Sequence, residues 1–177
     1  RSSDLYAVLH GFDAGYAKEL LGDAAPKLKL VVCSDSSEKL TIAQSIAFQL
    51  KSVGIETEIT EYDKSEYMTA VEQRKFDLYL GEVKVTPDMD LSPLCGTGGA
   101  LNYSGLSTPP VDAALAGYKA QGGKEAAKAL METLDAECPV IPLYYVQKEV
   151  AAPAAVLEVL MPTAANPLAG IENVQLG

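Results

Sequence analysis

The fold is decided by three strand-length segments: LKLVV (residues 28–32), IETEIT (55–60) and FDLYL (76–80). The first is a short apolar run of the kind found in buried strands. In the other two, apolar and polar residues alternate, which is the period of a half-buried strand. We therefore predict three β-strands between residues 28 and 80.

Two helical patterns separate these strands. In residues 38–53 the apolar side chains recur every three or four positions, so one stripe faces a core. Ser36 or Ser37 can start this helix and Gly54 can end it, and a shorter helix is predicted over 64–74. Alternation of strands and helices implies parallel strands joined by right-handed crossovers. The prediction is an α/β fold: a parallel-rich βαβ sheet with helices on both faces.

The flanking segments are predicted to be helical or irregular. Further helices are expected over residues 13–24, 110–118 and 124–138. Residues 140–146 form an apolar segment interrupted by Pro142, which favours an edge or crossing strand. The tail, residues 151–177, is rich in Ala and Pro. We expect one α/β unit in residues 1–139, with the crossing strand and tail of residues 140–177 packed on it.

Composition makes several functional classes unfavourable. The 177 residues include 14 Lys and Arg against 24 Asp and Glu, and the net charge of −10 disfavours nucleic acid and anionic membrane surfaces. Apolar residues make up 48%, as in a globular core, and no apolar run reaches the roughly 18–20 residues of a membrane span. No signal peptide is recognisable. Because the sequence begins at Arg1 rather than Met, we expect a processed or excised piece.

Three cysteines, Cys33, Cys95 and Cys138, are too few and too far apart for a disulfide framework or a structural zinc site. One disulfide with one spare thiol stays open for an exported protein. Cys33 ends an apolar run and Cys138 ends a helical pattern, so both are expected to be buried and unreactive. Cys95 lies in a Gly-rich stretch and is expected to be the most exposed. The single histidine, His10, is expected to be a surface or capping residue.

Residues 82–109 interrupt the alternation with a long Pro- and Gly-rich excursion. Long irregular loops in compact domains are usually functional or mobile. This loop follows a predicted parallel strand, so it leaves the sheet at the carboxyl edge, where open α/β sheets bind their ligands. We therefore expect a binding site here.

Several stretches, in the same order along residues 16–145, resemble one known family. They are YAKELL (16–21), AQSIA (43–47) with Leu50 and GI (54–55), Tyr67 with FDLYL (76–80), PD (87–88), NYSG (102–105), PVD (110–112) and PVIPLY (139–144). The chain is similar there to the C-terminal lobe of the family 5 extracytoplasmic solute-binding proteins, the peptide- and nickel-binding components of ABC importers.

The resemblance implies one lobe of a periplasmic-binding-protein-like type II fold, without catalysis and without a cofactor or metal. Its implied partners are an oligopeptide, dipeptide or other small solute, an ABC permease in the membrane and a missing N-terminal lobe, but no nucleic acid. It also implies an extracytoplasmic location, with a lipid anchor at the N-terminus of the full-length protein. The chain departs from the family in having the length of one lobe only and no Trp. In the family, the segment corresponding to residues 140–177 crosses to the other lobe.

Five residues are candidates for ligand contact. Glu82 or Asp88 could bind an amino terminus or another cation through charge-assisted hydrogen bonds, and Lys84 could pair with a carboxylate. In peptide-binding relatives an acidic residue of this loop binds the peptide's amino terminus, but the family's "DY" pattern is not evident here. Asn102 could form hydrogen bonds with ligand groups, and the Tyr103 ring could stack on them. Apart from Lys84, each of these residues has an alternative role without ligand contact. Glu82 and Asp88 could be solvated loop carboxylates, Asn102 could hold a turn, and the Tyr103 ring could pack under the loop.

Two other functions remain open at this point. An α/β enzyme could use Glu82, Asp88 or Asp77 as a general acid or base, although Asp77 is better read as structural and Asp112 as a cap or flank of the next helix. A ligand-sensing or scaffold domain could share the fold. The sequence contains no GxSxG, HExxH, Walker or GxGxxG motif, and no catalytic residue is predicted.

Overall fold

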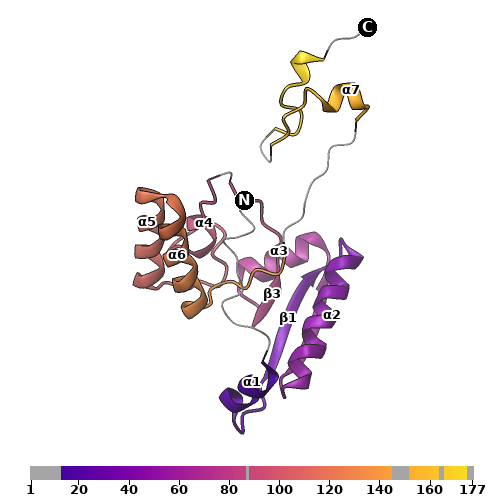
Figure 1. The fold of residues 1–177 in the computed structure, drawn as a ribbon. Helices are drawn as coiled ribbons and strands as arrows, with labels where there is room; N and C mark the ends of the chain where they lie inside the picture. Colours follow the sequence, from indigo (N-terminus) through magenta and orange to yellow (C-terminus); the bar gives the residue numbers. More distant parts are fainter. Residues whose placement is uncertain (1–12, 87, 145–151, 164–165, 175–177) are drawn as a thin grey trace. The chain divides into compact units, whose positions relative to one another are not determined.

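The computed structural model describes residues 13–86, 88–144, 152–163 and 166–174. The chain divides into two compact units, residues 1–84 with 91–139, and residues 85–90 with 140–177. Within the described residues, the sheet and the helices that cover it belong to the first unit (Figure 1).

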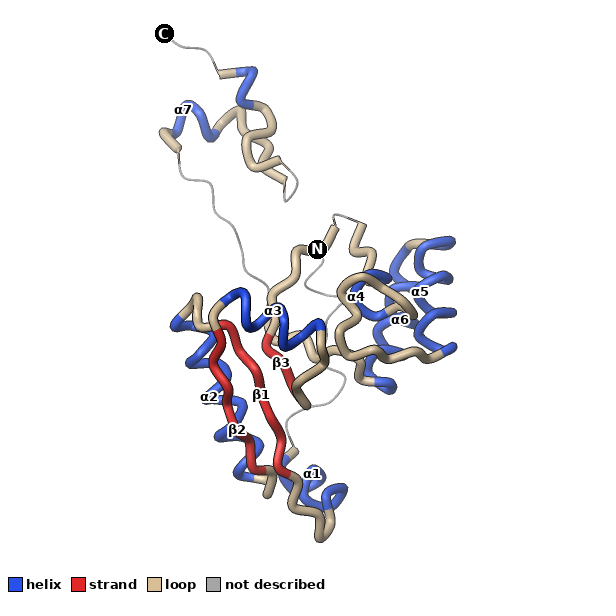
Figure 2. Tube along the Cα trace, turned by 180° about the vertical axis from the view of Figure 1, so that it is seen from behind, coloured by secondary structure: helices blue, strands red, loops and turns tan. Residues whose placement is uncertain are grey.

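The sheet has three parallel strands in the order β2-β1-β3. The central strand β1 (Lys27–Cys33) lies between β2 (Glu56–Tyr62) and β3 (Leu78–Leu80), as Figure 2 shows. In register, Leu30 of β1 is opposite Ile59 on one side and Leu78 on the other. The predicted parallel βαβ arrangement is confirmed.

The last strand is shorter than predicted: it begins at Leu78, so Phe76 and Asp77 lie before it. Asp77 nevertheless ties this segment to β1: its N–H donates to the Lys29 carbonyl (3.0 Å), and its carboxylate accepts the Lys29 N–H (2.7 Å). The structural role expected for Asp77 is confirmed, although it holds a strand rather than capping a loop.

The crossover helices α2 (Ser37–Ser52) and α3 (Lys64–Glu72) cover opposite faces of the sheet, and the two views related by 180° show them on opposite sides of the strands (Figures 1 and 2). On the α2 face, Leu30 and Val32 pack with Ala43. The partly buried residues around this cluster are Leu40, Ile46, Ile59, Leu78 and Leu80. On the α3 face, Val31 and Val71 are almost completely buried. Both faces of β1 are therefore core.

Local signals start these helices: those of α2 were predicted, and the capping box of α3 was not. The Ser36 hydroxyl accepts the Lys39 N–H at the start of α2, and Gly54 follows the helix with a φ of +102°. At the start of α3, Asp63 and Glu66 form a reciprocal capping box. Each pair satisfies backbone donors that a helix start would otherwise leave unbonded.

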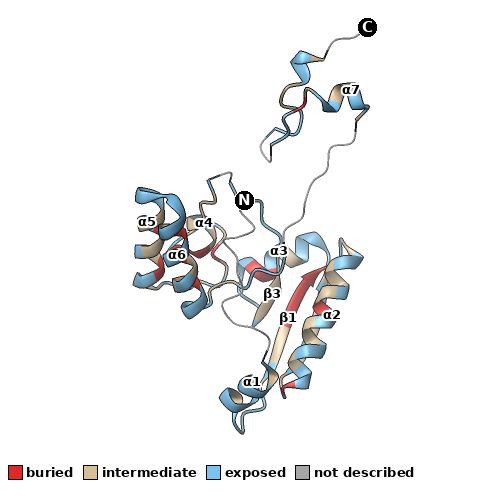
Figure 3. Cartoon of the chain, viewed as in Figure 1, coloured by how far each residue is buried: buried red, intermediate tan, exposed pale blue. Residues whose placement is uncertain are grey.

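The remaining helices of the first unit are α1 (Ala14–Leu21), α4 (Ser92–Cys95), α5 (Pro109–Gln121) and α6 (Gly123–Glu137). Helices α4, α5 and α6 pack together and bury Cys95, Val111, Leu115, Ala127, Leu130 and Leu134 (Figure 3). By contrast, α1 is capped by Asp13 but has no buried residue. None of these helices is long and apolar enough to cross a membrane, nor is any other helix in the described ranges.

Two of the three cysteines are placed opposite to expectation. Cys33 is buried at the end of β1, as predicted. Cys95 is buried because α4 packs against α5, and this burial raises the pKa of its thiol to about 11. Cys138 is exposed because α6 ends there in a left-handed conformation, with φ +47°. All three thiols are free.

The second unit contains a short helix α7 (Ala154–Leu157) and a 3-10 turn η2 (Ile171–Asn173). The Met161 N–H donates to the Ala169 carbonyl (2.8 Å) and closes a loop between them. Residues 140–144 form no strand, and the rest of the predicted strand, 145–146, lies outside the described residues, as does His10. The packing of residues 140–177 on the lobe stays a prediction.

Candidate functional site

The carboxyl edge of the sheet brings together residues from all three strand ends. Strands β1, β2 and β3 end at Cys33, Tyr62 and Leu80, and because they are parallel these ends lie at one edge. The first residues after them begin loops or helices with polar groups: Asp35 after β1 and Glu82 after β3. This is the edge at which open parallel sheets carry ligand sites.

A lysine with two carboxylates lies at this edge. The Lys39 Nζ is 3.1 Å from Oδ1 of Asp35 and 3.5 Å from Oε2 of Glu82. Lys39 comes from the first turn of α2, so it faces back toward the strand ends, and its side chain is only 21% exposed. The cluster therefore combines Asp35 and Lys39, from the connection between β1 and β2, with Glu82, from the segment that follows β3.

Within this cluster, electrostatics favour the charged forms of Asp35 and Lys39. The hydrogen bond from Lys39 lowers the pKa of Asp35, and the positive charge of Lys39 adds to the effect. For Lys39, burial alone would lower the pKa, but the hydrogen bond and charge of Asp35, together with Glu82, outweigh it and raise the pKa. The contact between Asp35 and Lys39 is therefore a charged one.

A group of half-buried tyrosines lies beside the ends of β1 and β3. The Tyr67 hydroxyl of α3 donates to the Leu80 carbonyl at the end of β3 (3.0 Å). The Tyr79 ring of β3 contacts the Tyr103 ring edge-on, with centroids 6.1 Å apart and an interplanar angle of 84°. Burial raises the pKa of Tyr67 and of Tyr79, so both hydroxyls stay protonated and able to donate at neutral pH.

Gly81 keeps the backbone close to these rings. A Cβ at this position would lie 2.9 Å from the Tyr79 ring and 3.5 Å from the Tyr67 hydroxyl. A larger residue would therefore push the segment toward Glu82 away from the tyrosines. This close approach keeps Glu82, the next residue along the chain, beside the tyrosine rings.

Asn102 holds the loop that carries Tyr103. It is 8% exposed, and its amide nitrogen donates to the carbonyls of Gly96 (2.9 Å) and Leu106 (2.8 Å). Its amide oxygen accepts from the Ser104 hydroxyl (2.8 Å) and the Gly105 N–H (3.0 Å). Both donors and the acceptor are thus used inside the loop, so the side chain acts as its internal scaffold.

A second contact fixes the other end of the loop. The Asp112 carboxylate on α5 accepts the Thr97 N–H (2.8 Å) and the Thr97 hydroxyl (2.6 Å). These two hydrogen bonds lower the pKa of Asp112, the hydroxyl bond having the larger effect. The role expected for Asp112 near the start of the helix is thus extended: it ties α5 to the loop.

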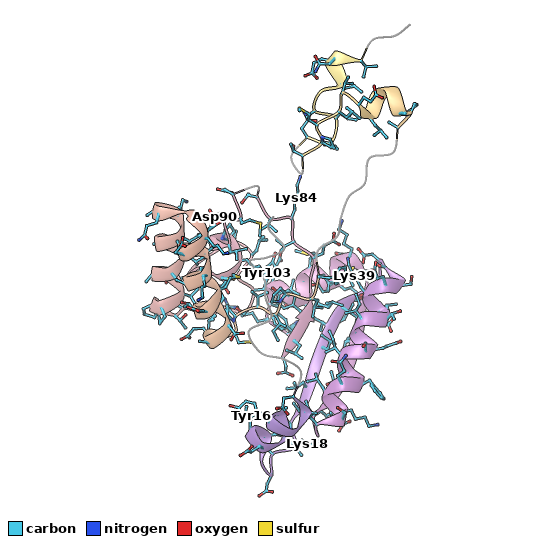
Figure 4. The ribbon with its side chains drawn as sticks, in the orientation of Figure 1. Tyr16, Lys18, Lys39, Lys84, Asp90 and Tyr103 are labelled. Atoms are coloured by element: carbon cyan, nitrogen blue, oxygen red, sulfur yellow. The ribbon has the colours of Figure 1, made fainter. Side chains whose placement is uncertain are left out.

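The structure brings only some of the predicted contact residues together. Glu82 joins the lysine cluster, and Tyr103 joins the tyrosines. Asn102 is committed to the loop. Lys84 and Asp88 are exposed, and Asp88 belongs to the second unit. In Figure 4, Lys39 and Tyr103 lie at one end of the first unit, and Tyr16 and Lys18 lie at the other.

Sequence reasoning missed Asp35, Lys39, Tyr67 and Tyr79 as site residues. A signal for the first two was present: they are four residues apart around the predicted start of a helix that follows a parallel strand. Such a helix start lies at the carboxyl edge. Within the ranges that the structure describes, no group of three His, Cys, Asp or Glu could hold a metal ion.

Comparison with models of protein families and with curated proteins finds no match for the sequence. Solved structures do match. The Escherichia coli murein tripeptide binding protein MppA superposes with a TM-score of 0.63 and 21% identity, covering 71% of this chain and 27% of that one. NikZ from Campylobacter jejuni, in complex with Ni(L-His), superposes with a TM-score of 0.59 and 15% identity, covering 72% of this chain and 31% of NikZ.

OppA of Burkholderia pseudomallei matches with a TM-score of 0.58 and 20% identity, over 71% of this chain and 27% of its own. The chain thus spans between 27% and 31% of the length of these three structures. Likeness at this identity concerns the fold, and it extends over most of the chain. The fold of the chain is therefore that of one lobe of the family 5 extracytoplasmic solute-binding proteins.

Proposed function

We propose that the chain is the C-terminal solute-binding lobe of an ABC importer's receptor, that it is non-catalytic, and that its solute is a peptide. The observation that carries this proposal is the shared fold over 71% of the chain with a murein tripeptide binding protein. The charged and aromatic side chains at the carboxyl edge of the sheet support it, because binding proteins of this architecture need polar groups and flat apolar faces there.

The proposed site consists of the lysine cluster (Asp35, Lys39, Glu82) and the tyrosines (Tyr67, Tyr79, Tyr103). The two exposed carboxylates would bind the amino group of a peptide, since charge-assisted hydrogen bonds are the stronger ones. The Tyr103 ring has a flat face and a polar tip, so it would pack on a side chain or on a peptide bond of the solute. Contacts of the exposed Lys84 and Asp88 with the solute stay predictions.

The rest of the receptor would complete the site. A second, N-terminal lobe would cover the solute by hinge closure, and the closed form would present it to a membrane permease. The proposal includes an extracytoplasmic location with a lipid anchor on the full-length protein. A single lobe leaves most of the solute in water, so we expect the 177-residue chain alone to bind peptide weakly, with Kd roughly in the millimolar range.

NMR titration of the chain tests the proposal, because it detects weak binding and locates it. The probes are alanine-rich tripeptides with free termini and, separately, Ni²⁺ with L-histidine. We expect the tripeptides to shift the amide signals of Gly81, Glu82 and Tyr103. Submicromolar affinity, or no shift at this edge with either probe, would contradict the proposal.

Matched tyrosine variants make the test specific. Tyr103→Ala is expected to weaken tripeptide binding about 2–10-fold, the range for loss of one aromatic contact. Tyr16→Ala removes an exposed tyrosine from α1, far from this edge, and is expected to leave the affinity unchanged (Figure 4). Equal effects of the two variants would place the binding elsewhere.

A further inference from the structure

Arg74 has an unusual backbone conformation for its residue type. It follows α3 with a φ of +54°, in the left-handed region that favours glycine. Its N–H donates to the Val71 carbonyl (3.1 Å), so the residue closes the helix as glycine commonly does. A long side chain at such a position carries a conformational cost that glycine would avoid.

The Arg74 side chain packs on the loop that carries Tyr103. A Cβ built on Gly105 would overlap the Arg74 Cζ and both of its Nη atoms, so the guanidinium lies directly against the Gly105 backbone. Gly105 itself has a φ of +68°. Position 105 thus favours glycine for two independent reasons, its own backbone conformation and the guanidinium beside it.

Gly105 is linked to Tyr103 through Asn102. The Gly105 N–H donates to the backbone carbonyl (3.1 Å) and the side-chain oxygen (3.0 Å) of Asn102, the residue just before Tyr103. The Tyr103 ring in turn meets Tyr79 edge-on. Because Arg74 lies between α3 and β3, its contact connects the loop to the segment that leads into Tyr79.

We infer that Arg74 is a positioning residue: its guanidinium, packed on Gly105, holds the loop so that the Tyr103 ring stays edge-on to Tyr79 at the carboxyl edge. The consequence for solute affinity rests on the proposed function, whereas the orientation of the ring does not. The inference also explains why a residue with an unfavourable φ would be kept at the end of α3.

Arg74→Gly separates positioning from stability, because glycine adopts the same φ without strain. We expect the variant to unfold at the same or a higher temperature than the parent chain. At the same time, the ring-to-ring NOE between Tyr79 and Tyr103 should be lost, and the ring-proton shifts of Tyr103 should move toward those of an unstructured peptide. An unchanged NOE would overturn the inference.

Two further variants identify what the side chain contributes. Arg74→Lys keeps the charge but not the planar group, and we expect it to restore the NOE only in part. Lys51→Gly removes a basic side chain at the end of α2 and should leave both tyrosine signals unchanged. Full recovery with lysine, or loss of the NOE in the Lys51 variant, would show that charge rather than packing acts here.

A double-mutant cycle measures the contact itself. Gly105→Ala introduces strain at φ +68° in any background, but the Cβ meets the guanidinium only when Arg74 is present. We therefore expect Gly105→Ala to lower the melting temperature less in the Arg74→Gly background than in the parent. An equal decrease in both backgrounds would contradict the contact.

Solute titration then links ring position to binding. With the tripeptide probe, Arg74→Gly should weaken binding about as much as Tyr103→Ala, and the two changes together should be no worse than Tyr103→Ala alone. Normal affinity despite a lost NOE would overturn the role in binding. If the parent chain binds no probe, the proposed function fails, and the NOE experiment still decides the role of Arg74 in positioning.

Discussion

The two edges of the sheet each carry a lysine with two carboxylates, but in different surroundings. At the amino edge, the Lys27 Nζ is 3.5 Å from Glu56 and 3.9 Å from Glu58, and the lysine side chain is 59% exposed. At the carboxyl edge, Lys39 has contacts of similar length to Asp35 and Glu82 but is 21% exposed.

The difference lies in what surrounds the charges. In the Lys27 cluster, Lys27 of β1 faces Glu56 of β2 in an exposed cross-strand pair of the ordinary kind, and Glu58 lies two residues further along β2. The Lys39 cluster draws on the first turn of α2 and the segment after β3. Topology, rather than the type of residue, therefore distinguishes a candidate site from a solvated ion pair.

The largest expected effect contrasts the core with the amino-edge helix. Leu30→Ala should lower the free energy of unfolding by about 2–5 kcal/mol, because Leu30 is 2% exposed in the central strand and its loss leaves a cavity. Leu20→Ala on α1, where the side chain is 70% exposed, should change it by less than about 0.5 kcal/mol. Urea unfolding measures both, and similar losses would show that α1 is an integral part of the core.

The next effect concerns the loop at the carboxyl edge. Asn102→Ala should lower the free energy of unfolding by about 1–3 kcal/mol, because buried carbonyls of the loop lose their donors. Ser104→Ala, which removes one hydroxyl from the same network, should have a smaller effect. Hydrogen exchange at the Gly105 amide should accelerate in the Asn102 variant. Unchanged exchange there would mean that the loop does not depend on this side chain.

A pH-dependent effect distinguishes Asp112 from an ordinary surface carboxylate. Its hydrogen bonds from Thr97 lower the pKa below the usual 3.8, so the folded state binds this proton less tightly than the unfolded state. The stabilisation is present above about pH 4 and is lost as the pH falls through the lowered pKa. We expect Asp112→Asn to reduce the urea midpoint at pH 6 and to have a smaller effect at pH 3.

Asp23→Asn provides the control, since Asp23 is an exposed residue of the loop after α1. Its urea midpoint should follow that of the parent chain at both pH values. A deficit of the Asp112 variant that persists undiminished at low pH would contradict the role of its charge.

The smallest effect compares the two lysines directly. Lys39→Met should lower the free energy of unfolding by less than about 1 kcal/mol, because the carboxylates that it contacts are exposed. Lys27→Met should lower it by still less, because there the lysine is exposed as well. The Lys39 effect should also persist better in high salt, since covered charges are less screened. Urea unfolding at low and high salt tests this. A larger or more salt-resistant loss at Lys27 would reverse the comparison.

Much of the fold could be predicted because local patterns carry it. The apolar period of residues 38–53 and the alternation in 55–60 predict α2 and β2, and each alternate position then points to a definite face. The cap at Ser36 was also readable, because its side chain bonds a backbone donor only three residues away. Such signals need no knowledge of distant contacts.

The candidate site was only partly predictable. Glu82 and Tyr103 could be selected because they follow a parallel strand in an irregular loop. Asn102 was selected for the same reason, but its burial makes it the scaffold of the loop. The exposures of Cys95 and Cys138 were interchanged because they depend on how α4 packs against α5 and where α6 ends. Burial of this kind is a property of the packed chain.

The order of strands and helices, their parallel pairing and the edge at which a site would lie follow from local constraints, namely apolar periodicity and crossover handedness. The contacts of Lys39 with Glu82, of Tyr103 with Tyr79 and of Arg74 with Gly105 arise only in the packed chain. These partners are far apart along the chain, and no periodicity links them. They meet because the strand order and the packing of the loop, taken together, bring their backbones to the same place.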